Sequence, residues 1–446
     1  MHSTWDKWLF TQVDNTALVL FRMIFGLLLA SEAFGSIALG AVRRLFIEPQ
    51  TTFTFIGFEF LEPLPGNWMY VLYSLMGIAG LMIMVGYKYR VAMTFYAITW
   101  AYVYLLQKSS YNNHCYLLML LNVIMIFLPA HRSASLDAKL SPEIRREHMS
   151  RWIYIFIISF IWIVYAYASV AKFYPDWLDG SFPKYLMSTR GKNFDILQHD
   201  WAHKSILYFG LFFDLLIVPF LLWKPTRWIA VAASIFFHLF NSVVFQIGIF
   251  PYLALSFLLF FFPTQTLHRR LIWRKTYYAA REIIVPKTKS FISIACVTFL
   301  LVMLLLPLRH WAIHDDVLWT EEGHRLSWRM MLRSRSGIGS FYIINKSTGE
   351  KEYVHLPKYL SRKQQRSVQS KPDFIWQFAQ KLEKIYAEQG KEIEVYADVK
   401  VSINGRPFQQ LTDPGVDLAA EEWNHFGHHD WIMKSALYPR QTHLKN

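Results

Sequence analysis

The sequence predicts a mainly α-helical membrane protein: a bundle of about nine transmembrane helices, followed by a β-rich α+β domain on the outer face. Three observations predict this fold class. The 446 residues are 54% hydrophobic, which is too apolar for a typical soluble protein. Many apolar runs approach the roughly 18–20 residues that cross the hydrocarbon core of a bilayer. From about residue 307 onward, charges become frequent and the apolar runs shorten.

Nine apolar runs define the expected spans and give a transmembrane helical bundle, of the horizontally transferred transmembrane type, over residues 1–306. Arg22 interrupts the first run, so it must pair or face a polar cavity, and Asp214 or Glu32 is the expected partner. The fourth and eighth runs are short for a span and depend on tilt or on neighbouring helices. The runs lie at about 16–39, 67–87, 90–107, 116–130, 152–170, 205–222, 227–245, 250–262 and 290–306.

The formal charge of +14 is compatible with nucleic acid or with anionic lipid as a partner. Its distribution favours lipid, because Lys and Arg concentrate in the loops after the second, fourth, sixth and eighth runs. The positive-inside rule then places the N-terminus in the cytoplasm and, with nine spans, everything after Leu306 outside. We expect a multi-pass integral membrane protein that binds no nucleic acid. The basic loops hold Lys88, Arg90, Arg132, Lys139, Arg145, Arg146, Arg151, Lys224, Arg227, Arg269, Arg270, Arg274, Lys275, Arg281, Lys287 and Lys289.

Residues 307–446 have the pattern of a small extracytoplasmic domain. Two short β-type runs flank the polar stretch 345–350, which is typical of a hairpin. Within 372–389, apolar residues recur at helical spacing before Gly390, a typical C-cap. Strict alternation from Ile393 to Ile403, followed by Asn404-Gly405, predicts a half-buried strand that ends in a tight turn.

Two polar segments interrupt the apolar pattern. The run Lys108-Ser-Ser-Tyr-Asn-Asn-His114 separates the third and fourth spans, and Lys172 ends the fifth. Ionisable groups next to lipid are costly and mark functional sites. With nine spans, both segments lie on the side of the C-terminal domain, so we expect chemistry at that face. For Lys108 itself, a side chain that snorkels to the interface is the favoured interpretation.

The sequence contains no CxxC pair, HExxH motif, Gly-rich phosphate loop or nucleophile elbow. Cys115 and Cys296 are too few for a disulfide framework and are not expected to pair. The cluster of His425, His428 and His429 is interpreted as a solvated polar tail in preference to a metal site. No metal is expected.

Five segments, in order between Phe21 and Trp431, resemble the vitamin K-dependent γ-glutamyl carboxylases. One such motif alone would be weak, whereas five in sequence are specific. They are Lys108–Leu117 with Asn112, Asn113 and His114; Tyr165–Trp177 with Lys172 and Asp176; Phe237–Ser242 and Ile247–Tyr252 with His238 and Asn241; Ser327–Ser336 with Trp328, Arg333 and Arg335; and Val401–Pro414.

The resemblance implies a peptidyl-glutamate 4-carboxylase, an enzyme of the carbon–carbon lyase class. Such enzymes oxidise vitamin K hydroquinone with O2 to its epoxide, remove a γ-proton from protein-bound glutamate and add CO2 to give γ-carboxyglutamate. The γ-C–H of glutamate is too weakly acidic for a side chain to deprotonate near neutral pH. An oxygenated quinol must therefore supply the base, so the implied cofactors are vitamin K hydroquinone, O2 and CO2, without a metal.

The resemblance also implies residue roles. Lys172 would deprotonate the quinol, which requires the neutral amine, and burial at the end of an apolar helix favours that form. His114 is the second catalytic candidate, in quinone recognition or carbanion handling. A carboxylate of the substrate would accept charge-assisted hydrogen bonds from arginines. The expected quinone contacts are Asn112, Asn113, His238 and Asn241, and the expected substrate contacts are Trp328, Arg333 and Arg335.

Each assignment has a structural alternative. Lys172 is equally placed to be an interfacial snorkelling lysine. His114 would then cap or hydrogen-bond at a helix mouth, and His238 would be a satisfied core histidine. Trp328 and Arg333 would pack in the core and on the surface of the outer domain.

Departures from the animal enzymes limit what is carried over. Ala171 stands where they have a second lysine, Arg333 stands where they have a histidine, and their long C-terminal extension is missing. We expect a compact bacterial homologue in the inner membrane, with membrane lipid, a glutamate-containing peptide or protein and a quinone reductase as partners. Two other functions stay open: a quinol epoxidase of this fold without protein carboxylation, and a non-catalytic quinone-binding or lipid-binding membrane protein.

Overall fold

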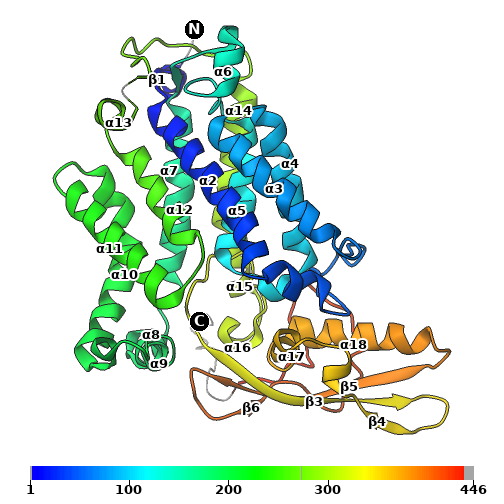
Figure 1. Cartoon of the computed structure of the whole chain (residues 1–446). Coiled ribbons are helices and arrows are strands. Elements are labelled where there is room, and N and C mark those ends of the chain that lie inside the picture. The colour runs from blue at the N-terminus through cyan, green and yellow to red at the C-terminus, as the bar shows by residue number, and fades with distance from the viewer. Residues whose placement is uncertain (1–2, 273, 436–446) are drawn as a thin grey trace.

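The computed structural model describes residues 3–272 and 274–435, which form a helical bundle followed by an α+β domain (Figure 1). The N-terminus, β1 (Gln12–Asp14), α6 (Leu136–Leu140) and α13 (Thr264–Leu271) lie at one end of the bundle, and the C-terminal sheet lies at the other. The expected fold class is confirmed.

Each of the nine expected apolar runs forms a helix, and Figure 1 shows these helices running side by side between the two ends of the bundle. Their long apolar stretches bury large aliphatic and aromatic side chains against one another, and this packing holds the helices together. In chain order they are α2 (Thr16–Ala38), α3 (Trp68–Val85), α4 (Tyr89–Leu106), α5 (Asn113–Phe127), α7 (Trp152–Val170), α10 (Asp200–Leu222), α11 (Arg227–Phe245), α12 (Phe250–Ser256) continued by the 3₁₀ turn η5 (Phe257–Phe261), and α14 (Lys289–Leu305).

Fewer than nine helices meet a strict criterion for a span. Within the described residues, six are long and apolar enough to cross a membrane, or up to seven if a bent pair counts as one span. The bent pair joins residues 250–261 to α13 at an angle of 118°. Helix α5 has only 15 residues, and α4 carries Arg90 and several tyrosines. The number nine therefore describes helices in the bundle better than it describes full-length apolar spans.

Short helices cap and connect the bundle. They surround its two ends, where the backbone must leave one long helix and enter the next. These helices are α1 (Thr4–Leu9), α6, α8 (Pro175–Leu178), α9 (Ser181–Thr189), α13, α15 (Arg309–Ala312) and α16 (Val317–Thr320).

Arg22, inside α2, is held by backbone carbonyls. Its guanidinium donates to the carbonyl of Ile83 at 3.3 Å and to that of Ala134 at 2.7 Å. A Cβ at Gly86 would lie 2.1 Å from the Arg22 guanidinium, and Gly86 has a φ of +68°, so only glycine fits there. The expectation that Asp214 or Glu32 pairs with Arg22 is wrong, because its partners are backbone carbonyls near the end of α3 and in the loop before α6.

The C-terminal domain is a four-stranded antiparallel sheet in the order β4-β3-β5-β6. The predicted hairpin is confirmed by the pairing of Tyr342 with Tyr353, and the predicted strand is β5. Asn404 and Gly405 both have positive φ, as a tight turn after β5 requires. The strands are β3 (Arg335–Asn345), β4 (Lys351–Tyr353), β5 (Ile393–Ile403) and β6 (Gln409–Gln410), and a separate pair joins β1 to β2 (His148–Ser150).

Two helices cover the face of this sheet that is turned toward the bundle: α17 (Arg362–Val368) and α18 (Pro372–Ala387) (Figure 1). The predicted helix over 372–389 is therefore confirmed, and Gly390 has a φ of +74° just beyond its end. Burying each large apolar side chain contributes about 1.5–3 kcal/mol. The buried side chains shared by helix and strand are Phe374, Phe378, Leu382, Ile393, Val395, Ala397, Val399, Val401 and Ile403.

A buried charge network joins the domain to the bundle. Lys108 is 1% exposed, and its Nζ lies 3.0 Å from a carboxylate oxygen of Asp373, the second residue of α18. Arg325 pairs with the same oxygen at 2.8 Å. Burial lowers the pKa of Lys108 to about 8. The expectation that Lys108 snorkels is wrong, because the N-terminus of α18 covers it and supplies its counter-ion.

This network predicts an acid-sensitive contact between domain and bundle. Burial opposes ionisation of Asp373, but Arg325 and Lys108 outweigh burial and hold its pKa well below the ordinary value. A carboxyl group whose pKa is lower in the folded state than in the unfolded state stabilises the fold fully at a pH above its ordinary pKa. That stabilisation is lost as the pH falls below the ordinary pKa toward the depressed one. We expect the thermal unfolding midpoint to drop as the pH is lowered below about 4. An Asp373→Asn variant should show a smaller drop over the same pH range, and an equal drop would contradict this assignment.

Candidate functional site

A cavity of about 930 Å³ lies between α7, α10, α11 and the segment 321–335 that leads into β3. Its size falls within the roughly 300–1,000 Å³ typical of ligand sites. Of the nine residues that the sequence assigned to a site, eight line this cavity although they come from four separate segments. These eight are Asn112, Asn113, His114, Lys172, His238, Asn241, Arg333 and Arg335.

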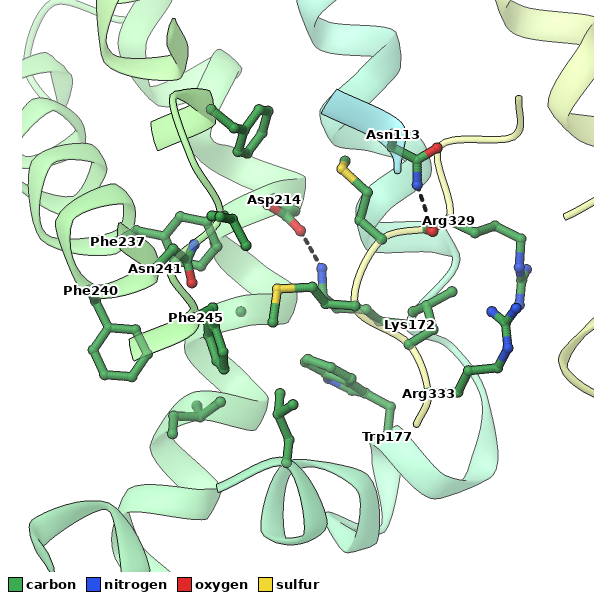
Figure 2. Close-up of a pocket in the computed structure, with 18 of the residues that line it drawn as sticks. Asn113, Lys172, Trp177, Asp214, Phe237, Phe240, Asn241, Phe245, Arg329 and Arg333 are labelled. Atoms are coloured by element: carbon green, nitrogen blue, oxygen red, sulfur yellow. Dashed lines mark hydrogen bonds and ion pairs between the residues drawn. The ribbon is translucent and has the colours of Figure 1, made fainter. Parts of the chain in front are cut away.

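Lys172 lies in the short loop between α7, which ends at Val170, and α8, which Pro175 begins. Its side chain is 5% exposed. The Nζ forms an ion pair with the carboxylate of Asp214 on α10 and donates to the carbonyl of Ala168 at 3.1 Å (Figure 2). The ring of Trp177 lies 5.3 Å from the Nζ. Lys172 is therefore a buried, paired amine and not a snorkelling one. The ion pair makes Asp214 the carboxylate that a proton leaving the Nζ of Lys172 would reach directly.

The loop that carries Lys172 is tied to the sheet. Asp176, which is fully buried, accepts a hydrogen bond from Asn404 at 2.8 Å and pairs with Arg406. Both partners follow directly after β5. The C-terminal domain therefore fixes the position of the loop, and through it the amine.

The two asparagines orient the entrance of α5. Asn112 caps the helix by accepting from the Cys115 backbone N–H at 2.9 Å. Asn113 accepts from the Tyr111 hydroxyl at 3.0 Å and donates to the carbonyl of Arg329 at 2.8 Å (Figure 2). Their protein partners hold the 108–114 run against the segment before β3. The ring of His114 also lines the cavity and faces the ring of Phe250 at 5.7 Å.

His238 and Asn241 lie three residues apart on α11 and line the same cavity. One imidazole nitrogen of His238, Nε2, lies 2.9 Å from the hydroxyl of Tyr165. The other, Nδ1, is buried and has no hydrogen-bond partner within the described part of the chain. The hydrogen bond to Tyr165 therefore accounts for only one of the two ring nitrogens of His238.

Trp328 lies outside the cavity lining. Its ring is 1% exposed and stacks on Tyr116 at 4.8 Å, with Phe160 at 6.0 Å. It anchors the segment before β3 in the core of the bundle. The structural alternative of packing holds for Trp328, although in the bundle and not in the outer domain. Its contact with substrate stays a prediction.

Arg333 and Arg335 converge on Glu321. Arg333 forms an ion pair with the Glu321 carboxylate, and Nη1 of Arg335 lies 3.7 Å from it. Backbone carbonyls of Leu318 and Trp319 hold Arg335 at 3.0 and 2.6 Å. Burial opposes ionisation of Glu321, but the arginines outweigh it and lower its pKa far below the ordinary value. The structural alternative, in which Arg333 packs on the surface of the outer domain, does not hold, because its side chain is only 10% exposed and packs against Glu321.

The cavity has two chemically different walls, with Lys172 between them (Figure 2). One wall is basic and contains Arg329 and Arg333. The other is aromatic and comes from α10, α11 and the first residue of α12. It suits an apolar ring or chain. The aromatic residues are Trp201, Phe209, Phe236, Phe237, Phe240, Phe245 and Phe250.

Of the C-terminal histidines, His425 is exposed, but His428 and His429 do not belong to a solvated tail. His429 is 5% exposed, and the Nδ1 atoms of His428 and His429 lie 2.8 and 2.7 Å from the two carboxylate oxygens of Glu322. The ring of Trp423 stacks on His429 at 4.2 Å. Among residues 3–272 and 274–435, no group of His, Cys, Asp and Glu is arranged to hold a metal ion.

Two family models match the chain one after the other. Residues 10–265, more than half of the chain, match the HTTM domain. Residues 288–437 match the lumenal domain of vitamin K-dependent gamma-carboxylase. The chain belongs to the vitamin K-dependent γ-carboxylase family. No solved structure matches it.

Membership of the carboxylase family gives the chain a vitamin K-dependent carboxylase-like function in a multi-pass membrane protein. The cavity fits vitamin K hydroquinone. An aromatic wall suits the ring and its apolar substituent, and His238 and Asn241 place polar groups beside that wall. His238, Asn241 and the aromatic residues would hold the group beside Lys172.

Two residues of the site were missed from sequence. Asp214 is a carboxylate within an apolar run, which marks it as functional, but it was assigned to Arg22 instead of to Lys172. Glu321 lies in a charged stretch that follows a short helix, where nothing in the local pattern separates it from solvated residues. Both partners depend on long-range packing that local spacing does not encode.

Proposed function

We propose that the chain is a peptidyl-glutamate 4-carboxylase, a carbon–carbon lyase that couples oxidation of vitamin K hydroquinone by O2 with carboxylation of protein glutamate. Hydroquinone, O2, CO2 and a glutamyl residue would give vitamin K epoxide, water and γ-carboxyglutamate. The supporting observation is the Lys172–Asp214 pair, which lies in one cavity between an aromatic wall and a group of arginines.

The chain's own residues supply proton handling and positioning. When bound, vitamin K hydroquinone would supply the strong base that glutamate requires, on reaction with O2. Lys172 would accept a hydroxyl proton at Nζ after passing its own proton to Asp214. Burial of both groups limits the exchange of that proton with water. His114, Asn112 and Asn113 would position the reacting groups on the side of the 108–114 run.

The basic wall would bind the peptide. Arg333 and Arg335 would hold the carboxylate of the substrate glutamate by charge-assisted hydrogen bonds, because guanidinium groups match carboxylates in geometry and charge. Trp328 would act on substrate only through the segment that it anchors. Membrane lipid surrounds the bundle, and a quinone reductase would return the oxidised product to hydroquinone.

The decisive assay measures both products. Detergent-purified protein is incubated with reduced vitamin K, labelled CO2 and a glutamate-rich peptide, and epoxide and fixed label are quantified. Both products are expected. Epoxide without label would identify a quinol epoxidase of this fold. A folded sample that gives neither product would contradict catalysis and leave a quinone-binding or lipid-binding role.

We also propose an orientation in which residues 307–446 are extracytoplasmic and the N-terminus is cytoplasmic, in a bacterial inner membrane. The basic loops Lys88–Arg90 and Arg132–Arg151 belong to the end of the bundle opposite the sheet (Figure 1). A Ser347→Cys variant, in the β3–β4 turn, should react with a membrane-impermeant maleimide in cells whose outer membrane is permeable, with the unmodified chain as control. Labelling only after the inner membrane is opened would contradict the orientation.

A further inference from the structure

The basic wall of the cavity carries more positive charge than its carboxylate neutralises. Arg329, Arg333, Arg335 and Lys371 line it together with Glu321. Asp214, the other carboxylate in the lining, is paired with Lys172. A buried excess of cations of this kind favours the entry of an anion.

Unpartnered donors lie on the same wall. Three buried guanidinium nitrogens have no hydrogen-bond partner in residues 3–272 and 274–435: Nε of Arg329, Nε of Arg333 and Nη2 of Arg335. A buried charged donor without an acceptor is costly. The guanidinium groups of this wall thus form a place with more donors than the protein's own acceptors fill.

Glu321 already fills part of that place. Its side chain is 7% exposed and pairs with Arg333. The backbone of Glu321 has a φ of +63°, which lies in the left-handed region. Glu321 ends α16 in this conformation, with its backbone N–H donating to the carbonyl of Val317, and a residue with a Cβ adopts it at a cost. The side chain of Glu321 is the same as that of the glutamate residue that the enzyme would modify.

We propose that Glu321 is an internal mimic of the substrate. Its own carboxylate pairs with Arg333 until the glutamate of a bound peptide replaces it. This inference rests on the proposed function, in which Arg333 and Arg335 bind the peptide carboxylate. Glu321 keeps the arginines paired and in place when no peptide is bound. It also weakens peptide binding, because the apparent affinity falls with the fraction of sites that are free to bind.

Direct binding tests this without relying on catalysis. A fluorescent peptide whose only acidic residues are glutamates is titrated with the full chain in detergent, and anisotropy gives the Kd. Glu321→Gln should lower the Kd about three- to tenfold by removing the competitor. Glu322→Gln, a matched change at the next residue, removes a carboxylate that binds histidines outside the cavity and should leave the Kd unchanged.

Two further arms keep the outcomes separate. A peptide with Gln at each Glu should bind weakly to every form, and equal binding of the two peptides would contradict carboxylate recognition itself, and with it the proposed function. If Glu321→Gln does not fold, Glu321→Asp keeps the charge but shortens the side chain, and its Kd should lie between those of the unmodified chain and a free site. Equal or weaker glutamate-peptide binding by a folded Glu321 variant would overturn the proposal.

Discussion

Replacement of Lys172 by alanine is expected to reduce vitamin K epoxide formation by at least about 10²-fold, the lower end of what a positioned base contributes. The Nζ of Lys172 is the buried amine that the proposed mechanism uses, and alanine leaves nothing in its place that can accept a proton. Carboxylation should fall to the same extent, because it depends on the same oxidation. The measurement is the initial rate of epoxide formation under saturating hydroquinone.

Controls separate chemistry from folding. Lys184→Ala, at an exposed lysine of α9 near the same end of the bundle, should retain full activity. A small amine added to the Lys172→Ala protein should restore part of the rate, because the cavity would admit a base where the side chain was removed. Undiminished epoxide formation in the alanine variant would refute Lys172 as the base.

Replacement of Asp214 by asparagine should have the second largest effect. The change keeps the shape but removes the carboxylate, so that Lys172 has no group to which it can pass its proton. Removing one partner of a buried ion pair typically costs about 3–5 kcal/mol of stability. We expect a lower unfolding midpoint and an epoxidation rate reduced about 10²-fold, with a changed pH dependence of the rate.

The pH profile distinguishes a role in proton transfer from one in packing. The pH–rate profile of Asp214→Asn should differ in shape from that of the unmodified protein, because Asp214 takes part in proton transfer only in the latter. Asp200→Asn, at an exposed position on the same helix, should alter neither stability nor rate. A folded Asp214→Asn protein with normal turnover and an unchanged profile would show that Asp214 serves packing alone.

The sequence predicted the elements well where periodicity is strong. Strict alternation located β5 between Ile393 and Ile403, and helical spacing located α18. The polar segments also predicted which parts of the chain lie together, because polar side chains are costly next to lipid and line one cavity instead. The number of full spans was overestimated, since α4 does not meet the criterion for a span and α5 is only a shorter apolar helix.

The pairing of charges could not be predicted in this way. Lys108, Arg22, His428 and His429 all have partners that are distant in sequence or belong to another element. A cation at a span end has the same local pattern whether it reaches water or a carboxylate. Only the docking of the C-terminal domain on the bundle decides between these outcomes, as Asp373 does for Lys108.

Density for a bound quinone tests the central claim most directly. A cryo-EM structure of the chain with reduced vitamin K should show the ring system between the 108–114 run and the end of α7. A ring oxygen should lie within hydrogen-bond reach of the Lys172 Nζ, about 2.6–3.2 Å. A ring system bound outside this cavity, with the Lys172–Asp214 pair unchanged and out of its reach, would contradict the account.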